Sequence, residues 1–105
     1  MDGKISIRYL QDYIKQKDCK PELLKDYFLK LSEEVGELSR AIRKDLRAPN
    51  SEDIKGSVEE ELWDVIYYAI ALANIYEVAL EQIIKRKEEM NQSRYPSNIM
   101  FEEGR

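Results

Sequence analysis

The fold is decided by LSEEVGELSRAI at residues 31–42 and by its echo, VEEELWDVIYYA, at residues 58–69. Both segments space their apolar residues three and four apart, which places them along one side of an α-helix. Each also carries two acids three residues apart: Glu34 with Glu37, and Glu61 with Asp64. Because a helix turns about 100° per residue, each acid pair lies on a flank of the apolar side, displaced in the same rotational sense. Packed antiparallel, the two helices would gather four carboxylates around one small volume.

The remaining periodicity predicts four helices, at residues 5–17, 21–46, 58–76 and 79–90. Ser57 with Glu60 forms a capping box before the third helix, and Pro96 stops the fourth. Short joints between helices are typical of an all-α bundle. At 105 residues, the chain is expected to form a single domain, residues 1–105, with a loose tail from about residue 97 to residue 105.

Apolar side chains cover more of the third helix than one small domain usually buries, so we expect a subunit interface there. The fold class predicted is therefore all-α, a four-helix bundle completed by oligomerisation as a dimer or a dimer of dimers. The stripes predicted to be buried are Leu24, Phe28, Leu31, Val35, Leu38 and Ile42 in the second helix, and Val58, Leu62, Val65, Ile66, Ala69, Ala73 and Tyr76 in the third.

Composition excludes several classes of function. A net charge of −4 argues against a nucleic-acid-binding face, which would be basic. The weakly charged stretch at residues 65–75 is too short to cross a bilayer, and no signal peptide is evident. Cys19 is the single cysteine, so no intramolecular disulfide forms, as expected in the reducing cytoplasm. With no histidine in the chain, imidazole bases, Ser-His nucleophiles and His-ligated zinc are excluded.

The acids Glu34, Glu37, Glu61 and Asp64 are hard oxygen ligands, which suit Mg²⁺ or Mn²⁺ in the absence of histidine. Four such carboxylates repel one another strongly unless a cation lies between them. The alternative is that they are solvated helix flanks in a chain that is 36% charged. Either pair alone favours that alternative, whereas both pairs beside an apolar stripe leave the two interpretations balanced.

Two other features fit a phosphorylated ligand. A basic cluster near the end of the fourth helix could clamp phosphates, although cations are also favoured at any helix C-terminus. Its members are Lys85, Arg86, Lys87, Asn91, Arg94 and Tyr95. Tyr68, one turn beyond Asp64, could stack on a base or bond to a ligand oxygen.

Together these motifs resemble the MazG-type nucleoside triphosphate pyrophosphohydrolases, an all-α superfamily. The resemblance lies in Glu33-Glu34-x-x-Glu37, then Glu61-x-x-Asp64, then Lys87-x-x-x-Asn91-x-x-Arg94-Tyr95-Pro96, and extends from about residue 26 to residue 96. Trp63 departs from the family pattern, in which small residues are common at that position.

This resemblance implies Mg²⁺-dependent hydrolysis of a nucleoside triphosphate at the α–β bond, releasing a monophosphate and pyrophosphate, for sanitation of the nucleotide pool. It implies a homodimer or homotetramer. Five acids would form the metal site, with Glu33 in support and with Glu37 and Glu61 catalytic: Glu33, Glu34, Glu37, Glu61 and Asp64. The substrate-binding residues would be Tyr68, Lys87, Asn91, Arg94 and Tyr95, with phosphates held across a subunit interface.

Two rival hypotheses remain. A non-catalytic helical module, binding a metal, a nucleotide or a partner, would tolerate replacement of Glu37 or Asp64. A nucleotide-binding regulator would bind its ligand tightly without forming product. The enzyme is favoured because metal-binding acids and phosphate-binding groups occur together. The sequence leaves open the preferred base, the sugar and the number of metal ions.

Overall fold

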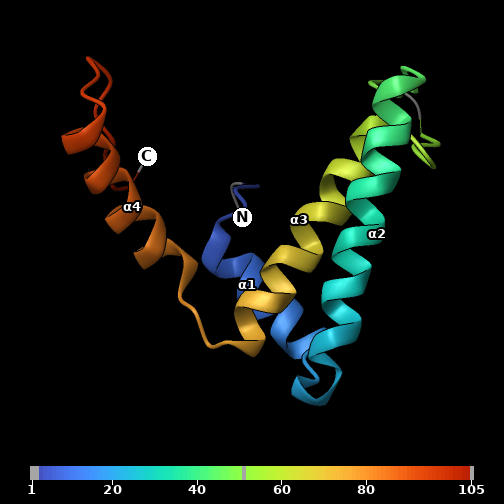
Figure 1. Cartoon of the computed structure of the whole chain (residues 1–105), viewed down its shortest axis with the longest axis horizontal. Coiled ribbons are helices and arrows are strands. Elements are labelled where there is room, and N and C mark those ends of the chain that lie inside the picture. The colour runs from blue at the N-terminus through green and yellow to red at the C-terminus, as the bar shows by residue number, and fades with distance from the viewer. Residues whose placement is uncertain (1–2, 51, 105) are drawn as a thin grey trace.

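The computed structural model describes residues 3–50 and 52–104, so residues 1, 2, 51 and 105 lie outside the description (Figure 1). The described residues contain helices and no strand, which confirms the all-α prediction. The elements are α1 (Ile7–Lys17), the short 3₁₀ helix η1 (Pro21–Leu23), α2 (Leu24–Arg43), α3 (Val58–Ile75) and α4 (Leu80–Arg94). In this part of the chain no helix combines the length and the apolar character that a membrane span requires.

The long helices α2 and α3 run antiparallel and pack against each other along their length (Figure 1). Helix α1 crosses the lower part of α3, and α4 lies on the far side of α1 from α2 (Figure 1). The four helices therefore do not close into a compact bundle within one chain. The α2–α3 pair forms one arm and α4 forms the other, with α1 between them.

Side chains fix where α1 and α3 begin. Ser6 Oγ accepts a hydrogen bond of 3.0 Å from Tyr9 N, so α1 starts two residues later than the periodicity predicted. Ser57 Oγ accepts from Glu60 N at 3.1 Å, while Glu60 Oε1 accepts from Gly56 N at 2.8 Å. The predicted capping box at the start of α3 is thus present in the structure.

Helices α2 and α3 end in the same way, with a non-glycine residue in the left-handed region. Asp45 has φ 51° and Glu77 has φ 56°. After each of these residues the next amide reaches back five residues, from Leu46 N to Ala41 O and from Val78 N to Ala73 O, both at 2.9 Å. This is the Schellman arrangement, which glycine normally provides. Because no glycine marks the turn, the second helix was predicted three residues too long.

The core of the single chain is small and lies where α1 meets α2 and α3. It consists of Ile14, Tyr27, Ile70 and Ala71. At the edge of this core, Asp18 accepts two hydrogen bonds. Its two carboxylate oxygens accept from the hydroxyls of Tyr27 at 2.5 Å and Tyr67 at 3.3 Å. Burial, followed by the nearby Asp18, raises the pKa of Tyr27 to about 12, so this hydroxyl remains a donor at neutral pH.

No residue of the apolar stripes predicted to be buried is fully buried within one chain, which corrects the sequence-based expectation: seven of the thirteen are exposed and the other six are half-buried. On α2 the exposed fractions are 59% for Phe28 and 58% for Ile42, and on α3 they are 47% for Leu62 and 45% for Ile66. The reason is that α1 packs against a different, neighbouring side of α3, through Ile70 and Ala71, and leaves these stripes uncovered. The α2 stripe repeats with alternating spacings of four and three, and so do positions 62, 66, 69, 73 and 76 of the α3 stripe, the pattern of a helix–helix seam.

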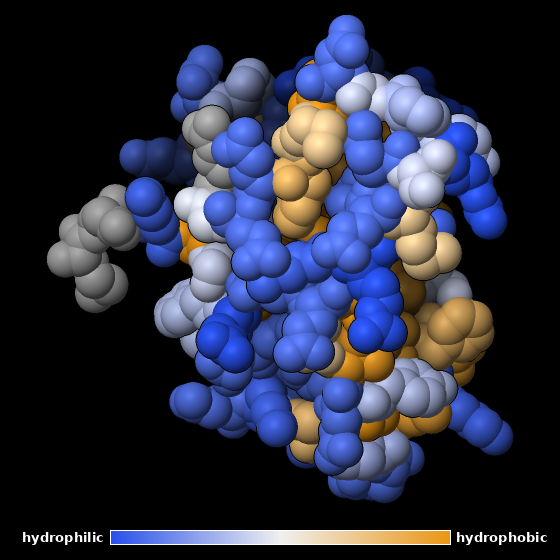
Figure 2. All heavy atoms as spheres, turned by 90° about the vertical axis from the view of Figure 1, so that its left-hand side faces the viewer, coloured by the Kyte–Doolittle hydropathy of each residue, from blue (hydrophilic) through white to orange (hydrophobic). Residues whose placement is uncertain are grey.

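The face that carries α4 is different in character. Figure 2 shows mostly hydrophilic side chains there, with separate apolar patches between them. Helix α4 continues to Arg94, four residues beyond the predicted end, and Pro96 follows. Residues 97–104 form no helix and contact α4 through an ion pair of 3.2 Å between Lys85 and Glu103. That the tail is loose stays a prediction.

Candidate metal centre

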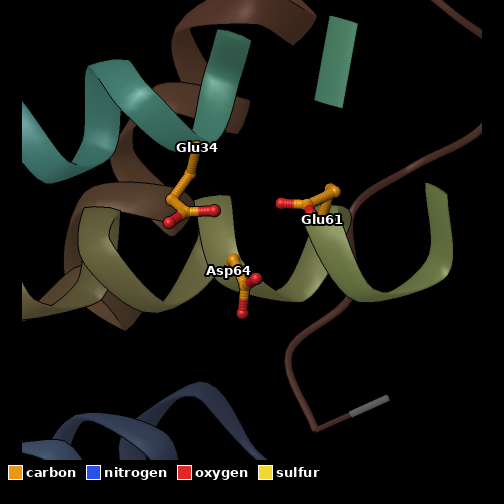
Figure 3. Close-up of side chains that lie close together, drawn as sticks. All are labelled: Glu34, Glu61 and Asp64. Atoms are coloured by element: carbon orange, nitrogen blue, oxygen red, sulfur yellow. The ribbon is translucent and has the colours of Figure 1, made fainter. Parts of the chain in front are cut away.

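Three acids from two helices meet between α2 and α3. Glu34 reaches from α2 toward α3, where Glu61 and Asp64 lie one turn apart (Figure 3). One carboxylate oxygen from each residue lies within 4.8 Å of the other two. The antiparallel pairing of the two helices produces this cluster, because it sets the acidic flank of each helix against the other. The sequence predicted that all four acids of the two pairs would converge; the structure brings Glu34, Glu61 and Asp64 together and leaves Glu37 outside the cluster.

The cluster is partly shielded from water. The side chain of Glu61 is buried, with only 6% of the residue exposed, while Glu34 and Asp64 are half-buried. Glu61 Oε2 is buried without a hydrogen-bond partner. Burying an ionised carboxylate oxygen without a hydrogen-bond partner costs free energy, and a bound proton or cation would remove that cost.

Burial changes the acidity of the cluster. It raises the pKa of Glu61 to about 7, with the adjacent carboxylate of Glu34 as the next largest cause and smaller contributions from Asp64 and Glu60. It also raises the pKa of Asp64, and the charges of Glu34 and Glu60 act in the same direction. Both shifts show that this volume disfavours negative charge, and a divalent cation bound there would reverse them.

The donor set fits a hard divalent cation. Three carboxylates on two rigid helices supply oxygen ligands with no nitrogen or sulfur among them, which suits Mg²⁺ or Mn²⁺. Glu34, Glu61 and Asp64 are the residues that would hold the ion, and their remaining coordination positions would be left for water and substrate oxygens.

The other two predicted metal ligands lie outside this cluster. Glu37 is exposed one turn further along α2. Glu33 is exposed as well and forms an ion pair of 3.4 Å with Lys30. Their roles as ligands stay predictions.

Tyr68 lies on α3 one turn beyond Asp64 and is half-buried. Its ring packs edge-to-face against Tyr67, with the centroids 5.2 Å apart, and Tyr67 packs in the same way against Trp63 at 6.0 Å. An aromatic row therefore begins one turn beyond Asp64, and the contact of Tyr68 with a nucleotide stays a prediction.

The predicted phosphate-binding residues all lie on α4 or just after it. Lys87, Arg94 and Tyr95 are exposed, and Asn91 is half-buried. Figure 1 shows α4 on the other side of α1 from α2, so a single chain does not bring these residues to the acids. Within one chain, the metal-binding half of the predicted site and its phosphate-binding half are separate.

Sequence reasoning missed the polar contacts that hold α1 in place. The side chain of Gln11 forms hydrogen bonds with Asn74, Val78 and Leu80. The side chain of Asp18 accepts hydrogen bonds from Tyr27 and Tyr67. Asn74 offered a signal, because it is an amide in the otherwise apolar second half of α3 and a buried amide needs a partner.

The fold and the acid cluster define a class: an all-α protein in which facing helices present carboxylates suited to a divalent cation. The sequence model of the MazG nucleotide pyrophosphohydrolase domain matches residues 22–99, which is most of the chain. The chain belongs to the MazG nucleotide pyrophosphohydrolase family, as its motifs predicted.

Solved structures support this assignment. Two crystal structures of iMazG from Vibrio DAT 722 match, one with an N-terminal tag and one with a C-terminal tag. The first has a TM-score of 0.82 at 48% identity, over 89% of this chain and 100% of the other. The second has a TM-score of 0.80 at 49% identity, over 84% of this chain and 99% of the other. No curated protein matches the sequence.

Proposed function

We propose that this protein hydrolyses a ribo- or deoxyribonucleoside triphosphate between the α and β phosphorus atoms. Water attacks, the α–β bridging bond breaks, and a nucleoside monophosphate and pyrophosphate leave. The observation that carries the proposal is the cluster of Glu34, Glu61 and Asp64, in which the buried Oε2 of Glu61 has no hydrogen-bond partner. The family to which the chain belongs supports the reaction type.

A bound Mg²⁺, or Mn²⁺ in its place, would neutralise phosphate charge and activate water. Glu34, Glu61 and Asp64 would hold it from two helices, so that the position of the ion is fixed by the α2–α3 packing. Glu37 and Glu33 would act from the solvent side of the cluster, Glu37 as a catalytic acid beside Glu61, and Glu33 in support. Tyr68 would contact the nucleotide.

The phosphate-binding residues are proposed to come from a second copy of the chain. Lys87, Asn91, Arg94 and Tyr95 lie on the α4 arm, apart from the acids of the same chain (Figure 1). The exposed stripes of α2 and α3 supply the surface on which two copies would pair. We therefore propose a homodimer, or a homotetramer built from dimers, in which each site draws on two chains. A role in sanitising the nucleotide pool would place the protein in the cytoplasm.

The test is release of pyrophosphate from a panel of canonical and modified nucleoside triphosphates, with Mg²⁺ and after chelation. Glu61→Gln and Asp64→Asn should each reduce turnover at least about a hundredfold, since each removes a charged metal ligand. Glu22→Gln, at an exposed acid outside the cluster, is the matched control and should leave turnover unchanged. Tight nucleotide binding with no pyrophosphate from any substrate would refute the enzyme and favour a binding module.

A further inference from the structure

One side chain of α1 holds the joint between α3 and α4. Gln11 Nε2 donates to Asn74 Oδ1 at 3.1 Å and to Val78 O at 2.8 Å. Gln11 Oε1 accepts from Leu80 N at 2.9 Å. Asn74 Nδ2 in turn donates to the main-chain oxygen of Gln11 at 3.0 Å. A single glutamine thus bonds to the last part of α3, to the joint, and to the first residue of α4.

These bonds replace ones that the joint lacks. The N-cap residue of α4 is Ala79, whose side chain cannot accept a hydrogen bond, so the oxygen of Gln11 takes the place of a capping side chain. Asn74 is buried, with 7% exposed, and loss of the Gln11 side chain would leave its amide oxygen without this partner, while its nitrogen would still bond to the main-chain oxygen of residue 11.

Helices α1 and α4 each accept a hydrogen bond from a main-chain amide of the other. Glu81, in the first turn of α4, accepts a hydrogen bond of 2.9 Å from Arg8 N, in the first turn of α1. Each of the two helices therefore caps an amide in the first turn of the other. Leu80 also packs against the core cluster, which adds an apolar contact to the polar ones.

The direction of α4 matters because the predicted phosphate-binding residues lie along it. A helix rises about 1.5 Å per residue, so Arg94 lies about 20 Å from the joint and magnifies any tilt that begins there. Between α3 and α4 the chain has only the four residues 76–79, and the packing of α4 on α1 is its main contact with the other helices.

We propose that Gln11 is a positioning residue: by bridging Asn74, Val78 and Leu80 it fixes the direction of α4 and so places Lys87, Asn91 and Arg94 for phosphate binding. This inference rests on the proposed function for the identity of the ligand. The orientation of α4 itself is a property of the chain and can be measured without turnover.

The decisive comparison distinguishes two effects of Gln11 on α4: stabilising the start of the helix, and fixing the direction in which the helix runs. Gln11→Ala removes the cap and the side-chain bridge from α1 to Asn74, Val78 and Leu80, and leaves in place the bond from Asn74 to the main-chain oxygen of residue 11. Adding Ala79→Ser gives α4 a cap of its own, which restores helix stability but not the side-chain bridge to α1. Gln16→Ala, at an exposed glutamine on the same helix, is the control.

Three measurements are made on the full chain: Mg²⁺ affinity by calorimetry, pyrophosphate affinity with Mg²⁺ present, and KM and kcat for a hydrolysed triphosphate. A fourth is the distance between spin labels on Lys25 of α2 and Glu89 of α4, in a Cys19→Ser background. Labelled protein is diluted into unlabelled protein, so that each distance arises within one chain.

For Gln11→Ala we expect a broadened Lys25–Glu89 distance distribution, with KM and the pyrophosphate dissociation constant raised about tenfold. Mg²⁺ affinity and kcat should stay within about twofold, because the acids lie on α2 and α3 and only binding contacts are lost. Ala79→Ser should recover the unfolding midpoint and leave KM raised. If it restores KM as well, or if the distance distribution of Gln11→Ala matches that of the wild type, the positioning role is refuted. Failure of the proposed function would appear separately, as a wild type that neither binds pyrophosphate nor turns over.

Discussion

Replacing Glu61 by glutamine should make the metal-free protein more stable at alkaline pH, although it removes a proposed metal ligand. Glu61 is 6% exposed and its Oε2 has no partner, so its ionised form is disfavoured in the folded state. Glutamine has the same shape and no charge. The substitution therefore removes the cost of ionising a buried carboxyl group while it changes little of the packing.

The magnitude follows from the pKa. Burial raises the pKa of Glu61 from 4.5 to about 7. Between these values the folded protein holds a proton that the unfolded chain has released, so the free energy of unfolding falls as pH rises from about 4.5 to 7. Below this window both states are protonated, and above it both are ionised. At about 1.4 kcal/mol per pKa unit, the penalty on the wild type above pH 7 is at most about 3 kcal/mol.

The assay is urea-induced unfolding at one fixed protein concentration, between pH 4 and pH 8.5, in a chelator. At pH 8.5 we expect Glu61→Gln to be more stable than the wild type by about 1–3 kcal/mol, and at pH 4 the two should agree. Saturating Mg²⁺ should then stabilise the wild type and have little effect on the variant. The stability advantage of Glu61→Gln over the wild type should therefore shrink or change sign.

Glu22→Gln is the control for the removal of an acid, and its stability difference should not vary over this pH range. The reasoning is refuted if Glu61→Gln is less stable than the wild type at pH 8.5 in the chelator. A difference that is constant with pH would refute it too, since the effect must then arise from packing and not from charge.

Three further predictions test other parts of the structure. Tyr27→Phe removes a buried donor to Asp18 and should lower the free energy of unfolding by about 1–2 kcal/mol, measured in urea at pH 7. Ser57→Ala removes the N-cap of α3 and should cost about 1 kcal/mol in the same assay, whereas Ser93→Ala, at an exposed position late in α4, should cost less than about 0.5 kcal/mol. Ile66→Glu places a charge on the exposed stripe of α3 and should shift the protein from dimer or tetramer to monomer in analytical ultracentrifugation; an unchanged sedimentation coefficient would show that the stripe is not the interface.

Local pattern was enough to predict the helices and the centre of the site. Helical period and antiparallel packing together predicted that Glu34, Glu61 and Asp64 would meet, but the same reasoning also placed Glu37 there, and the structure leaves it outside the cluster. The capping box at Ser57 and Glu60 is equally local. Such features depend on residues a few positions apart, and the sequence shows them directly.

What the sequence did not show depends on distant contacts. The stripes of α2 and α3 are apolar enough to be read as core, yet which side of α3 is covered within the chain is decided by α1, through Ile14 and Ile70. The ends of α2 and α3 lack the glycine that usually marks such a turn, since Asp45 and Glu77 occupy it. The bridge from Gln11 spans 63 positions to Asn74, and no local rule pairs two amides so far apart.

The buried carboxyl group of Glu61 has a practical consequence in a chain without histidine. Its pKa of about 7 lies where imidazole protons normally dominate a titration, and here there are none. Proton uptake or release near neutrality can then be followed by infrared or carbon-13 NMR spectroscopy with little background. Loss of that signal on adding a cation would report occupancy of the site with no dye, no coupled assay and no substrate.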